Sequence, residues 1–556
     1  MSGIFIAKLR RTAPFIVLFG LAFTRFCYFG FQYFPQLDDY IQYHNLATQI
    51  GSLADFGRLF VALDLPRHRP IAGALDITLW SWLFGLSPVI LTALFSAALA
   101  GAALLFKAIF VRKMRAGYLM ALILTLLPLN FEGTYWLSAA SRVCIGLLFS
   151  ALSLYGYVRF CETGRKKYFL LYLPLQLLCF GLYEQAAVLT LALTAIFFLL
   201  YVRETRRARA ALLSIALIVI YGAYIILAPS VNKYAGQTAV VTPFEDGYFS
   251  YFLPILFGQL RSVFVSGTLL ISAKGFVRGI RIIASAPNFF YLPIVCALSA
   301  AAARLTLHTG DNPHSHKEKN AAITLAVGLA LAIAPTAPFF FQANVWFSMR
   351  GACMSLLGLG LIFDCIVSLA LRRVRARRTI TGILAGMIAL LCCVASVSEL
   401  YDYKRTAEYD RLLSGVVIAA LSDMPDTAAS AAFLNVPRTY LDDQNFYYHD
   451  HIHGVTESAW ALSGAVAYYY NGGGKLPAAT PLSPGVMAEP WQYNSFNLAG
   501  FDRLYLILEE NGAPERAVPV TLRPDGLIAG TDGTIFARIW EDNRYWYLEV
   551  YPTHHG

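Results

Sequence analysis

Long apolar runs recur from the N-terminus to Val397, and they constrain the fold of this sequence more than any other feature. Each run contains about 17–22 residues, the length at which an α-helix spans the hydrocarbon core of a bilayer. Of the 556 residues, 57% are hydrophobic and only 14% are charged, whereas about a quarter of the residues in a soluble protein are charged. The sequence therefore predicts a polytopic α-helical membrane protein.

The composition changes sharply after Val397. Residues from Glu399 onward are polar, rich in Tyr, Pro and Gly, and contain no run long enough to cross a bilayer. About 150 residues is a normal size for one domain. We therefore predict a transmembrane region at residues 1–398 and a water-facing domain at residues 399–556.

The C-terminal segment has the patterns of a mixed α/β domain. Apolar residues recur with helical spacing over Thr406–Leu421. Short stretches rich in β-branched and aromatic residues, separated by Gly, Asp and Pro, predict strands. The predicted strands are Leu504–Leu508, Val518–Leu522, Thr534–Ile539 and Trp546–Val550.

Clusters of Lys and Arg between the apolar runs determine the expected topology, because such clusters stay in cytoplasmic loops. If all of them do so here, the N-terminus is cytoplasmic, about eleven spans follow, and the C-terminal domain is extracytoplasmic. The outer loops are then residues 35–87 and 229–287. The basic clusters are Lys8–Arg11, Arg112–Arg115, Arg165–Lys167, Arg203–Arg209, Arg304–Lys319 and Arg372–Arg378. The expected spans are residues 13–34, 88–110, 117–130, 142–160, 168–182, 186–202, 211–228, 288–303, 321–341, 350–371 and 379–397.

Two further apolar stretches do not fit this topology as spans. A crossing at Ile71–Leu86 would place every later basic cluster outside, and this stretch also contains Asp76. The stretch Tyr251–Ile283 carries several basic side chains at amphipathic spacing. We expect the first to lie along the membrane surface, where its tryptophans would suit the interface, or to dip into the protein, and the second to lie at the outer headgroups. Whether residues 71–86 span the membrane is left open.

Net charge and cysteine content exclude several classes of function. The formal net charge is +10, but the basic residues are spread over short loops and do not form a nucleic-acid footprint. The nine cysteines all fall in or beside apolar runs, so no disulfide framework or zinc spacing is indicated. A basic N-terminus precedes the first apolar run without a small-residue cleavage site, so we expect a retained first span.

The adjacent carboxylates Asp38 and Asp39 follow directly after the first apolar run. Either one inside hydrocarbon would cost a few kcal/mol, so we expect both at or beyond the membrane boundary. One interpretation is that they cap a surface helix over Tyr40–Ile50. The other is that one Asp is a general base and its neighbour an orienting group or metal ligand.

A basic cluster, Arg67-His68-Arg69-Pro70, ends the polar part of the same loop. Basic residues are unusual in outer loops. In one interpretation these residues contact lipid phosphate. In the catalytic alternative, Arg69 with Arg67 neutralises a phosphate that departs during the reaction, since a guanidinium binds phosphate through two parallel hydrogen bonds.

Other charged residues occur at the expected outer ends of spans. Glu132 and Glu184, with His44 and Arg350, line one polar cavity in the functional interpretation, and the two acids are merely solvated in the alternative. Arg25, Arg142 and Arg350 either snorkel to the interface, or they pair with these acids or bind an anionic ligand. His44, together with His449, His451 and His453, supplies further possible ligands or bases, although no fourth metal ligand has a fitting spacing.

The layout of about the first 400 residues resembles the GT-C superfamily of integral-membrane glycosyltransferases. Leu37-Asp38-Asp39-Tyr40 stands where these proteins carry an acidic motif, and Arg69-Pro70 resembles the basic-Pro step that follows it. Tyr183-Glu184-Gln185 and Trp346–Arg350 stand where bacterial members commonly have similar residues. The tail lacks the WWD-type signature of oligosaccharyltransferases, so transfer to peptide is not expected.

The resemblance implies a sugar donor linked to polyprenyl phosphate, a glycan or lipid-linked acceptor, and a bacterial inner membrane. It also implies that one Asp accepts the acceptor's proton while Arg69, with Arg67, Lys274 or Arg278, binds the donor phosphate. The need for a divalent metal ion stays open. The rivals are a transporter or flippase, which would carry charges through the middle of several helices, and another outer-face transferase such as a polysaccharide ligase or acyltransferase.

Overall fold

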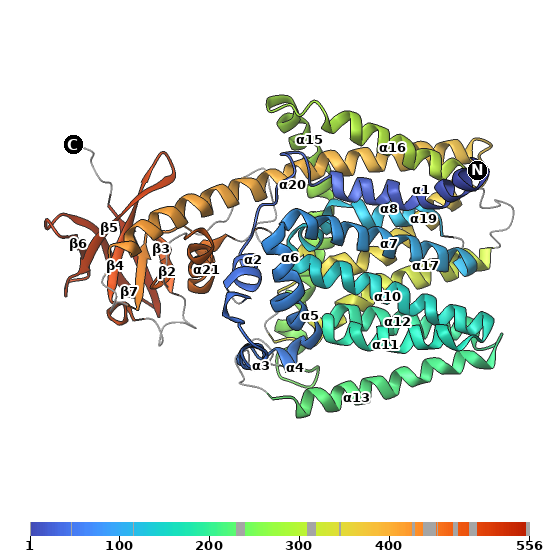
Figure 1. The fold of residues 1–556 in the computed structure, drawn as a ribbon, viewed down its shortest axis with the longest axis horizontal. Coiled ribbons are helices and arrows are strands. Elements are labelled where there is room, and N and C mark those ends of the chain that lie inside the picture. The colour runs from blue at the N-terminus through green and yellow to red at the C-terminus, as the bar shows by residue number, and fades with distance from the viewer. Residues whose placement is uncertain are drawn as a thin grey trace. The chain divides into compact units, whose positions relative to one another are not determined.

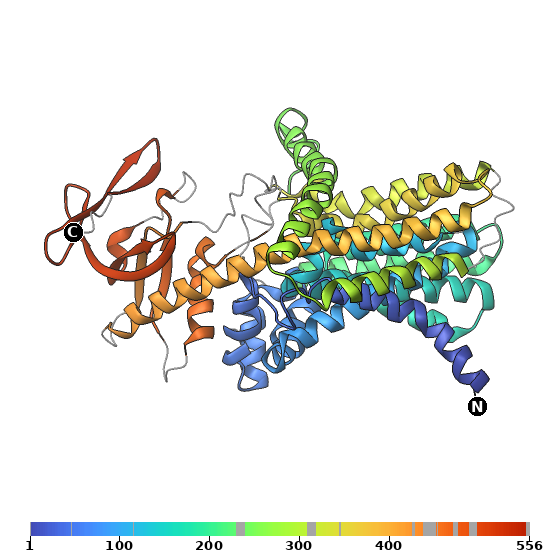
Figure 2. The ribbon, with the colours of Figure 1, turned by 90° about the horizontal axis from the view of Figure 1, so that it is seen from above.

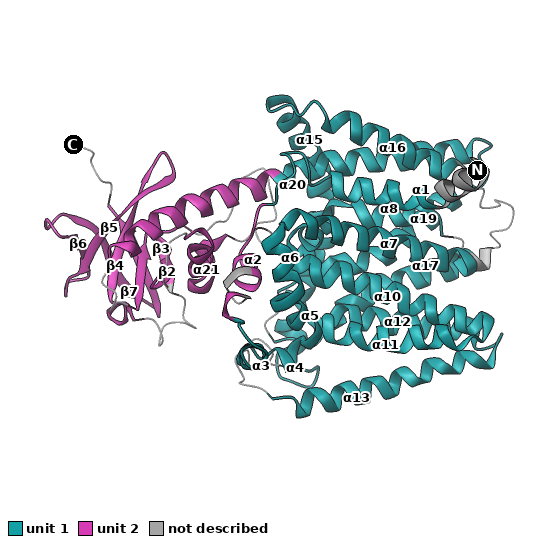
Figure 3. Ribbon diagram, in the orientation of Figure 1, with its two compact units in different colours: residues 1–33, 50–400, 443–451 teal, residues 34–49, 401–442, 452–556 magenta. Residues whose placement is uncertain are grey.

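The chain forms two compact units in the computed structural model (Figure 3). The first comprises Met1–Tyr33 and Ile50–Leu400 with Asp443–His451, and the second comprises Phe34–Gln49, Tyr401–Asp442 and Ile452–Gly556. The structure describes residues 2–45, 47–114, 116–229, 240–308, 318–343, 346–424, 429–437, 452, 454–470, 476–488 and 497–551.

The first unit is a bundle of helices, as the apolar runs predict (Figure 1). By length and composition, 8 helical stretches of the described chain could cross a membrane, which makes this a polytopic α-helical membrane protein. The bundle helices are α1 (Ser2–Thr24), α7 (Pro88–Met114), α8 (Tyr118–Leu126), α10 (Leu137–Thr163), α11 (Lys166–Leu182), α12 (Glu184–Tyr201), α13 (Leu213–Leu227), α16 (Tyr291–His308), α17 (Glu318–Ile333), α19 (Leu356–Ala370) and the first part of α20 (Arg377–Ser422).

The long apolar helices do not coincide fully with the predicted spans. The first predicted span reaches residue 34, but α1 ends at Thr24, and α8 has only 9 residues. Conversely, the stretch Tyr248–Ser285 is long and apolar enough to cross, although its basic residues predict a surface position. Length alone therefore does not reproduce the predicted topology.

The two stretches expected at the membrane surface lie at one end of the bundle. Helices α3 (Leu53–Ala62), α4 (Leu65–His68), α5 (Pro70–Leu75) and α6 (Ser81–Leu86) all occur at this end (Figure 1). Helices α14 (Leu253–Arg261) and α15 (Thr268–Ser285) run crosswise to the bundle helices (Figure 2). The first stretch packs against α7, α10 and α11, and α15 packs against α20.

Glycine allows α17 and α19 to pack in close contact. A Cβ on Gly358 would lie 2.3 Å from both the backbone nitrogen of Ala332 and the carbonyl oxygen of Gly328. Backbone atoms cannot move aside as the end of a flexible side chain can. The two helices can therefore approach to this distance only with glycine at position 358.

Replacing Gly358 by Val is expected to lower the apparent melting temperature of the detergent-purified protein by several degrees, because overpacking a close contact costs about 1–3 kcal/mol. Gly222→Val in α13 is the matched control, since a Cβ there meets nothing within 4 Å. Equal melting temperatures for the two variants would contradict the close packing.

The second unit contains an 8-stranded mixed sheet of order β2-β1-β4-β5-β6-β7-β8-β3. Strand β1 pairs in parallel with β2 and β4, and the other pairings are antiparallel. The strands are β1 (Ser430–Leu434), β2 (Ala478–Leu482), β3 (Gly485–Ala488), β4 (Arg503–Glu510), β5 (Ala513–Leu522), β6 (Leu527–Gly530), β7 (Ile535–Asp542) and β8 (Tyr545–Val550).

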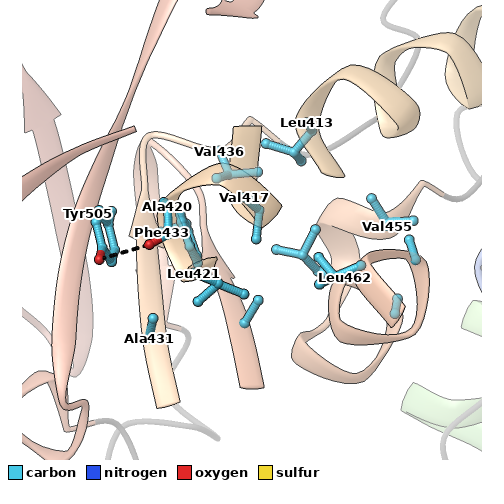
Figure 4. Packing of buried hydrophobic residues seen from close by; sticks show 14 of the residues in the cluster. Leu413, Val417, Ala420, Leu421, Ala431, Phe433, Val436, Val455, Leu462 and Tyr505 are labelled. Atoms are coloured by element: carbon cyan, nitrogen blue, oxygen red, sulfur yellow. Dashed lines mark hydrogen bonds between the residues drawn. The ribbon is translucent and has the colours of Figure 1, made fainter. Parts of the chain in front are cut away.

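Side chains alternate between two cores on the faces of this sheet. On one face, Phe433 and Tyr505 pack against the C-terminal part of α20 and against α21 (Ala459–Tyr469), as Figure 4 shows in part. On the other face, Leu434 and Leu506 join a core completed by the remaining strands. The domain is therefore mixed α/β, as the sequence predicts.

One segment is grouped differently from the sequence expectation. Residues 34–49 fall within the predicted transmembrane region, but in the structure they belong to the second unit. The cause is hydrophobic packing, because Tyr40 and Ile41 are buried in the core that α20 and α21 form on the sheet. The expected helix over Tyr40–Ile50 is replaced by α2 (Asp38–Tyr40), a π-helical turn at Ile41–Asn45 and a 3-10 turn at Ala47–Gln49.

Candidate functional site

The two adjacent aspartates differ in environment. Asp39 is fully buried, and its carboxylate oxygen Oδ2 accepts the backbone N–H of Gln36 at 3.0 Å. The Asp39 N–H in turn donates to the Gln36 carbonyl at 2.7 Å. Asp38 is only half-buried. The expected cap of a helix over Tyr40–Ile50 is therefore wrong, since Asp39 lies within the short helix α2 and holds the backbone before it. Asp38 is the more exposed carboxylate of the two.

The backbone just before this pair is strained. Leu37 has φ 23°, a positive value that a residue other than glycine rarely adopts. Such a conformation costs about 1–3 kcal/mol and persists only where its surroundings impose it, which is common at functional sites. We call residues Gln36–Tyr40 the acidic turn.

In the first unit, Arg69 and Glu184 form a bidentate ion pair. Arg69 Nε lies 2.9 Å from Glu184 Oε1, and Arg69 Nη2 lies 2.9 Å from Oε2. The guanidinium carbon also lies 5.0 Å from the centre of the Tyr183 ring. The side chains of Arg69 and Glu184 are 39% and 47% exposed. This arginine is therefore fixed in direction and open to a ligand.

Asp76 and Arg142 form a second pair that is largely buried. Arg142 Nη2 donates to Asp76 Oδ2 at 2.6 Å, and the Ser141 hydroxyl donates to Oδ1 at 3.3 Å. The two side chains are only 12% and 3% exposed. By sequence Asp76 argues only against a membrane span, and the pairing explains how an apolar helix tolerates this charge.

Glu132 and Arg350 form the third pair. Glu132, in α9 (Phe131–Tyr135), is fully buried, and its Oε2 accepts the backbone N–H of Arg350 at 2.9 Å. The Arg350 Nε lies 3.8 Å from Glu132 Oε1. The guanidinium lies 4.8 Å from the ring centres of both Trp136 and Trp346. The pair thus joins α9 to α18 (Met349–Ala352).

These pairs occupy neighbouring helix ends. Burial raises the pKa of the Tyr183 phenol, while the charges of Arg69 and Arg350 act against that rise. Gln185 donates to the Gly351 carbonyl at 2.8 Å, which connects the start of α12 to α18. Each acid has a partner of its own, Arg69 for Glu184 and Arg350 for Glu132, and the polar cavity that these residues would line stays a prediction.

Arg25 does not pair with these acids through its described hydrogen bonds. It is fully buried, and its guanidinium donates to the Asn130 side-chain oxygen at 2.8 Å and to the Thr134 hydroxyl at 2.6 Å. Its guanidinium carbon also lies 4.6 Å from the centre of the Phe26 ring. Arg25 thus anchors the segment that carries Glu132.

Two of the three residues predicted to bind donor phosphate with Arg69 contact other groups of the chain. Arg67 donates weakly to the Ile225 and Ile226 carbonyls at the C-terminal end of α13, at 3.3 and 3.4 Å. Arg278 donates to the Ser398 hydroxyl at 3.2 Å, and Lys274 lies one turn earlier on α15. These contacts connect Arg67 to α13 and Arg278 to α20.

The histidines of the sequence analysis add nothing to the described site. The side chains of His44, His449, His451 and His453 lie outside the described residues. Among the residues that the structure describes, no three His, Cys, Asp or Glu side chains form a group that could hold a metal ion.

The opposite end of the bundle also carries ion pairs. Arg112 pairs with Glu162, and Lys113 Nζ lies 2.6 Å from Glu204. These residues lie at or just beyond the ends of α7, α10 and α12, in the predicted cytoplasmic clusters or beside them. Ion pairs between basic side chains and carboxylates therefore occur at both ends of the bundle.

No protein-family model and no curated protein sequence matches this chain.

Proposed function

We propose that this chain is a membrane glycosyltransferase that moves a sugar from a polyprenyl-phosphate carrier to a glycan or lipid-linked acceptor. The observation that carries the proposal is the half-exposed, bidentate Arg69–Glu184 pair among the helix ends of a membrane bundle. Two oxygen atoms of a phosphate can accept the same pair of hydrogen bonds from the Arg69 guanidinium as the Glu184 carboxylate does. A phosphate can therefore replace this carboxylate.

The proposed reaction is a single displacement at the anomeric carbon. Asp38 accepts the proton of the acceptor hydroxyl, whose oxygen forms the new bond to the sugar. The bond from the anomeric carbon to the phosphate oxygen breaks, and the polyprenyl phosphate leaves with one additional negative charge, which Arg69 stabilises. The anomeric configuration is inverted. Asp39 acts indirectly, because its carboxylate holds the backbone of the acidic turn.

The proposal assigns the exported face of a bacterial inner membrane to the end of the bundle that carries the three Arg–carboxylate pairs. Basic residues at the ends of α7 and α10 support this assignment, because clusters of this kind remain cytoplasmic. The N-terminus is then cytoplasmic and the C-terminal domain extracytoplasmic. Activated sugars on that side are carried by lipid, since nucleotide sugars remain in the cytoplasm.

The transporter or flippase alternative has less support from the described charges. A transport path requires charges near the middle of several helices. Here Asp76 lies between two short helices, and Glu184 is the first residue of α12. The other alternative, a different outer-face transferase, would not depend on a polyprenyl-phosphate sugar.

Binding of decaprenyl phosphate to the protein in nanodiscs tests the proposal. Wild type is expected to bind decaprenyl phosphate and not decaprenol. Arg69→Ala is expected to weaken this binding about tenfold or more, because a charge-assisted contact of about 1.5–3 kcal/mol is lost. The control is Arg58→Ala, since the Arg58 side chain is 80% exposed on α3.

Two results would contradict the proposal. One is equal binding of the phosphate and the alcohol, which would leave no role for a phosphate site. The other is unchanged affinity in Arg69→Ala, which would remove this arginine from that site.

A further inference from the structure

The acidic turn is packed into the core of the C-terminal domain. Tyr40, which follows Asp39 directly, is fully buried, and its hydroxyl lies 3.1 Å from the Tyr469 hydroxyl. Its ring meets Tyr468 edge-on, with the ring centres 5.4 Å apart. Both partners lie at the C-terminal end of α21, so one helix fixes the residue next to the aspartates.

The tyrosine pair keeps this arrangement over a wide pH range. Burial raises the pKa of Tyr40 well above its ordinary value. Burial also raises the pKa of Tyr469. Both phenols therefore stay neutral where carboxylates are ionised, and one hydroxyl can donate to the other.

A glycine lets α21 approach the turn. A Cβ on Gly464 would lie 2.7 Å from Ile41 Cγ1 and 3.5 Å from Tyr40 Cβ. Ile41 is 3% exposed and branched at Cβ, so it has little freedom to move aside. Any side chain at position 464 would therefore push on the segment that follows Asp38 and Asp39.

We propose that α21 of the C-terminal domain positions the acidic turn for proton transfer, with Gly464 and Tyr469 as positioning residues. This inference rests on the function proposed above. It explains why Leu37 can keep its strained φ, since strain persists where surrounding packing imposes it. It also makes the domain a part of the catalytic apparatus. If the domain were an independent accessory module, a change in α21 would leave the acidic turn unchanged.

The test compares Gly464→Val with Gly415→Val, a matched substitution on α20 of the same unit, where an added Cβ meets nothing within 4 Å. Gly464→Val is expected to lower kcat for sugar transfer at least tenfold and to leave decaprenyl-phosphate affinity unchanged. It should also speed amide hydrogen exchange in residues 36–43 but not in strands β4–β8. Gly415→Val should match wild type in all of these measurements.

A milder variant keeps the test decisive if Gly464→Val does not fold. Tyr469→Phe removes one oxygen and is expected to lower kcat two- to fivefold with faster exchange in the same segment. If Gly464→Val and Tyr469→Phe transfer sugar at the wild-type rate, or leave exchange in residues 36–43 unchanged, the inference is overturned while the proposed function stands. If wild type consumes no polyprenyl-phosphate sugar, the function itself is wrong, and the inference falls with it.

Discussion

Asp38→Asn is expected to lower the rate of sugar transfer about 10²–10⁴-fold, the usual contribution of a general base. Asparagine has nearly the same shape as aspartate but cannot accept the acceptor's proton at neutral pH. Because Asp38 is half-buried and Asp39 carries the backbone hydrogen bond, the turn itself should be preserved. Donor binding should therefore be unchanged. A lower rate with unchanged donor binding would show that the chemical step is lost while the donor site is intact.

The neighbouring aspartate should respond differently. In Asp39→Asn the amide oxygen can still accept the Gln36 N–H, so we expect a smaller loss of rate, whereas Asp39→Ala removes the acceptor and releases the turn. The measurement uses protein in nanodiscs and a panel of radiolabelled polyprenyl-phosphate hexoses and pentoses. Variants are then assayed with the donor that wild type consumes.

A matched control for these variants is Asp55→Asn. Asp55 is also an aspartate at the start of a helix in the same expected outer loop, where it pairs with Arg58 on an exposed surface. It should retain the wild-type rate. Wild-type transfer by both Asp38→Asn and Asp39→Asn in folded protein would refute the assignment of a base to the acidic turn.

Glu132→Ala is expected to have the largest effect on stability, about 3–5 kcal/mol, because it leaves the partner of a buried ion pair uncompensated. The fully buried carboxylate accepts the Arg350 backbone N–H and faces the Arg350 guanidinium, which is held against two tryptophans. A loss of this size should lower the apparent melting temperature in detergent by several degrees.

Two comparisons make this prediction specific. Glu132→Gln keeps an oxygen acceptor for the Arg350 N–H, so it should lose less stability than Glu132→Ala. Glu204→Ala removes a side chain that is 56% exposed and paired with Lys113, and exposed pairs contribute only about 0–1 kcal/mol. If Glu132→Ala melts like Glu204→Ala, the buried pair does not stabilise the fold.

The predicted strands illustrate how far sequence patterns reach. Four predicted strands correspond to β4, β5, β7 and β8, where apolar and polar residues alternate or β-branched residues gather. The sequence patterns do not predict strands β1, β2, β3 and β6. Strand β1, with the sequence SAAFL, is almost entirely buried and lacks alternation, and short apolar runs of this kind have no distinctive period.

The charged residues at the helix ends show the same limit. The sequence predicted that Glu132, Glu184 and Arg350 share one environment, but it could not assign partners. Arg69 and Glu184 are separated by 115 positions, and Asp76 and Arg142 by 66. An ion pair requires only that two side chains lie close together in the folded protein. Their distance along the sequence does not indicate which helix ends are adjacent.

The amino-acid sequence by itself determined the membrane-helical class and the separate mixed α/β domain. A bilayer forces every backbone polar group to be satisfied within a helix, so an apolar run of sufficient length has few alternatives. Tertiary structure alone decided which arginine meets which acid and that the acidic turn packs against α21. Those outcomes depend on close packing between distant segments, such as Gly464 against Ile41, and no local pattern encodes such contacts.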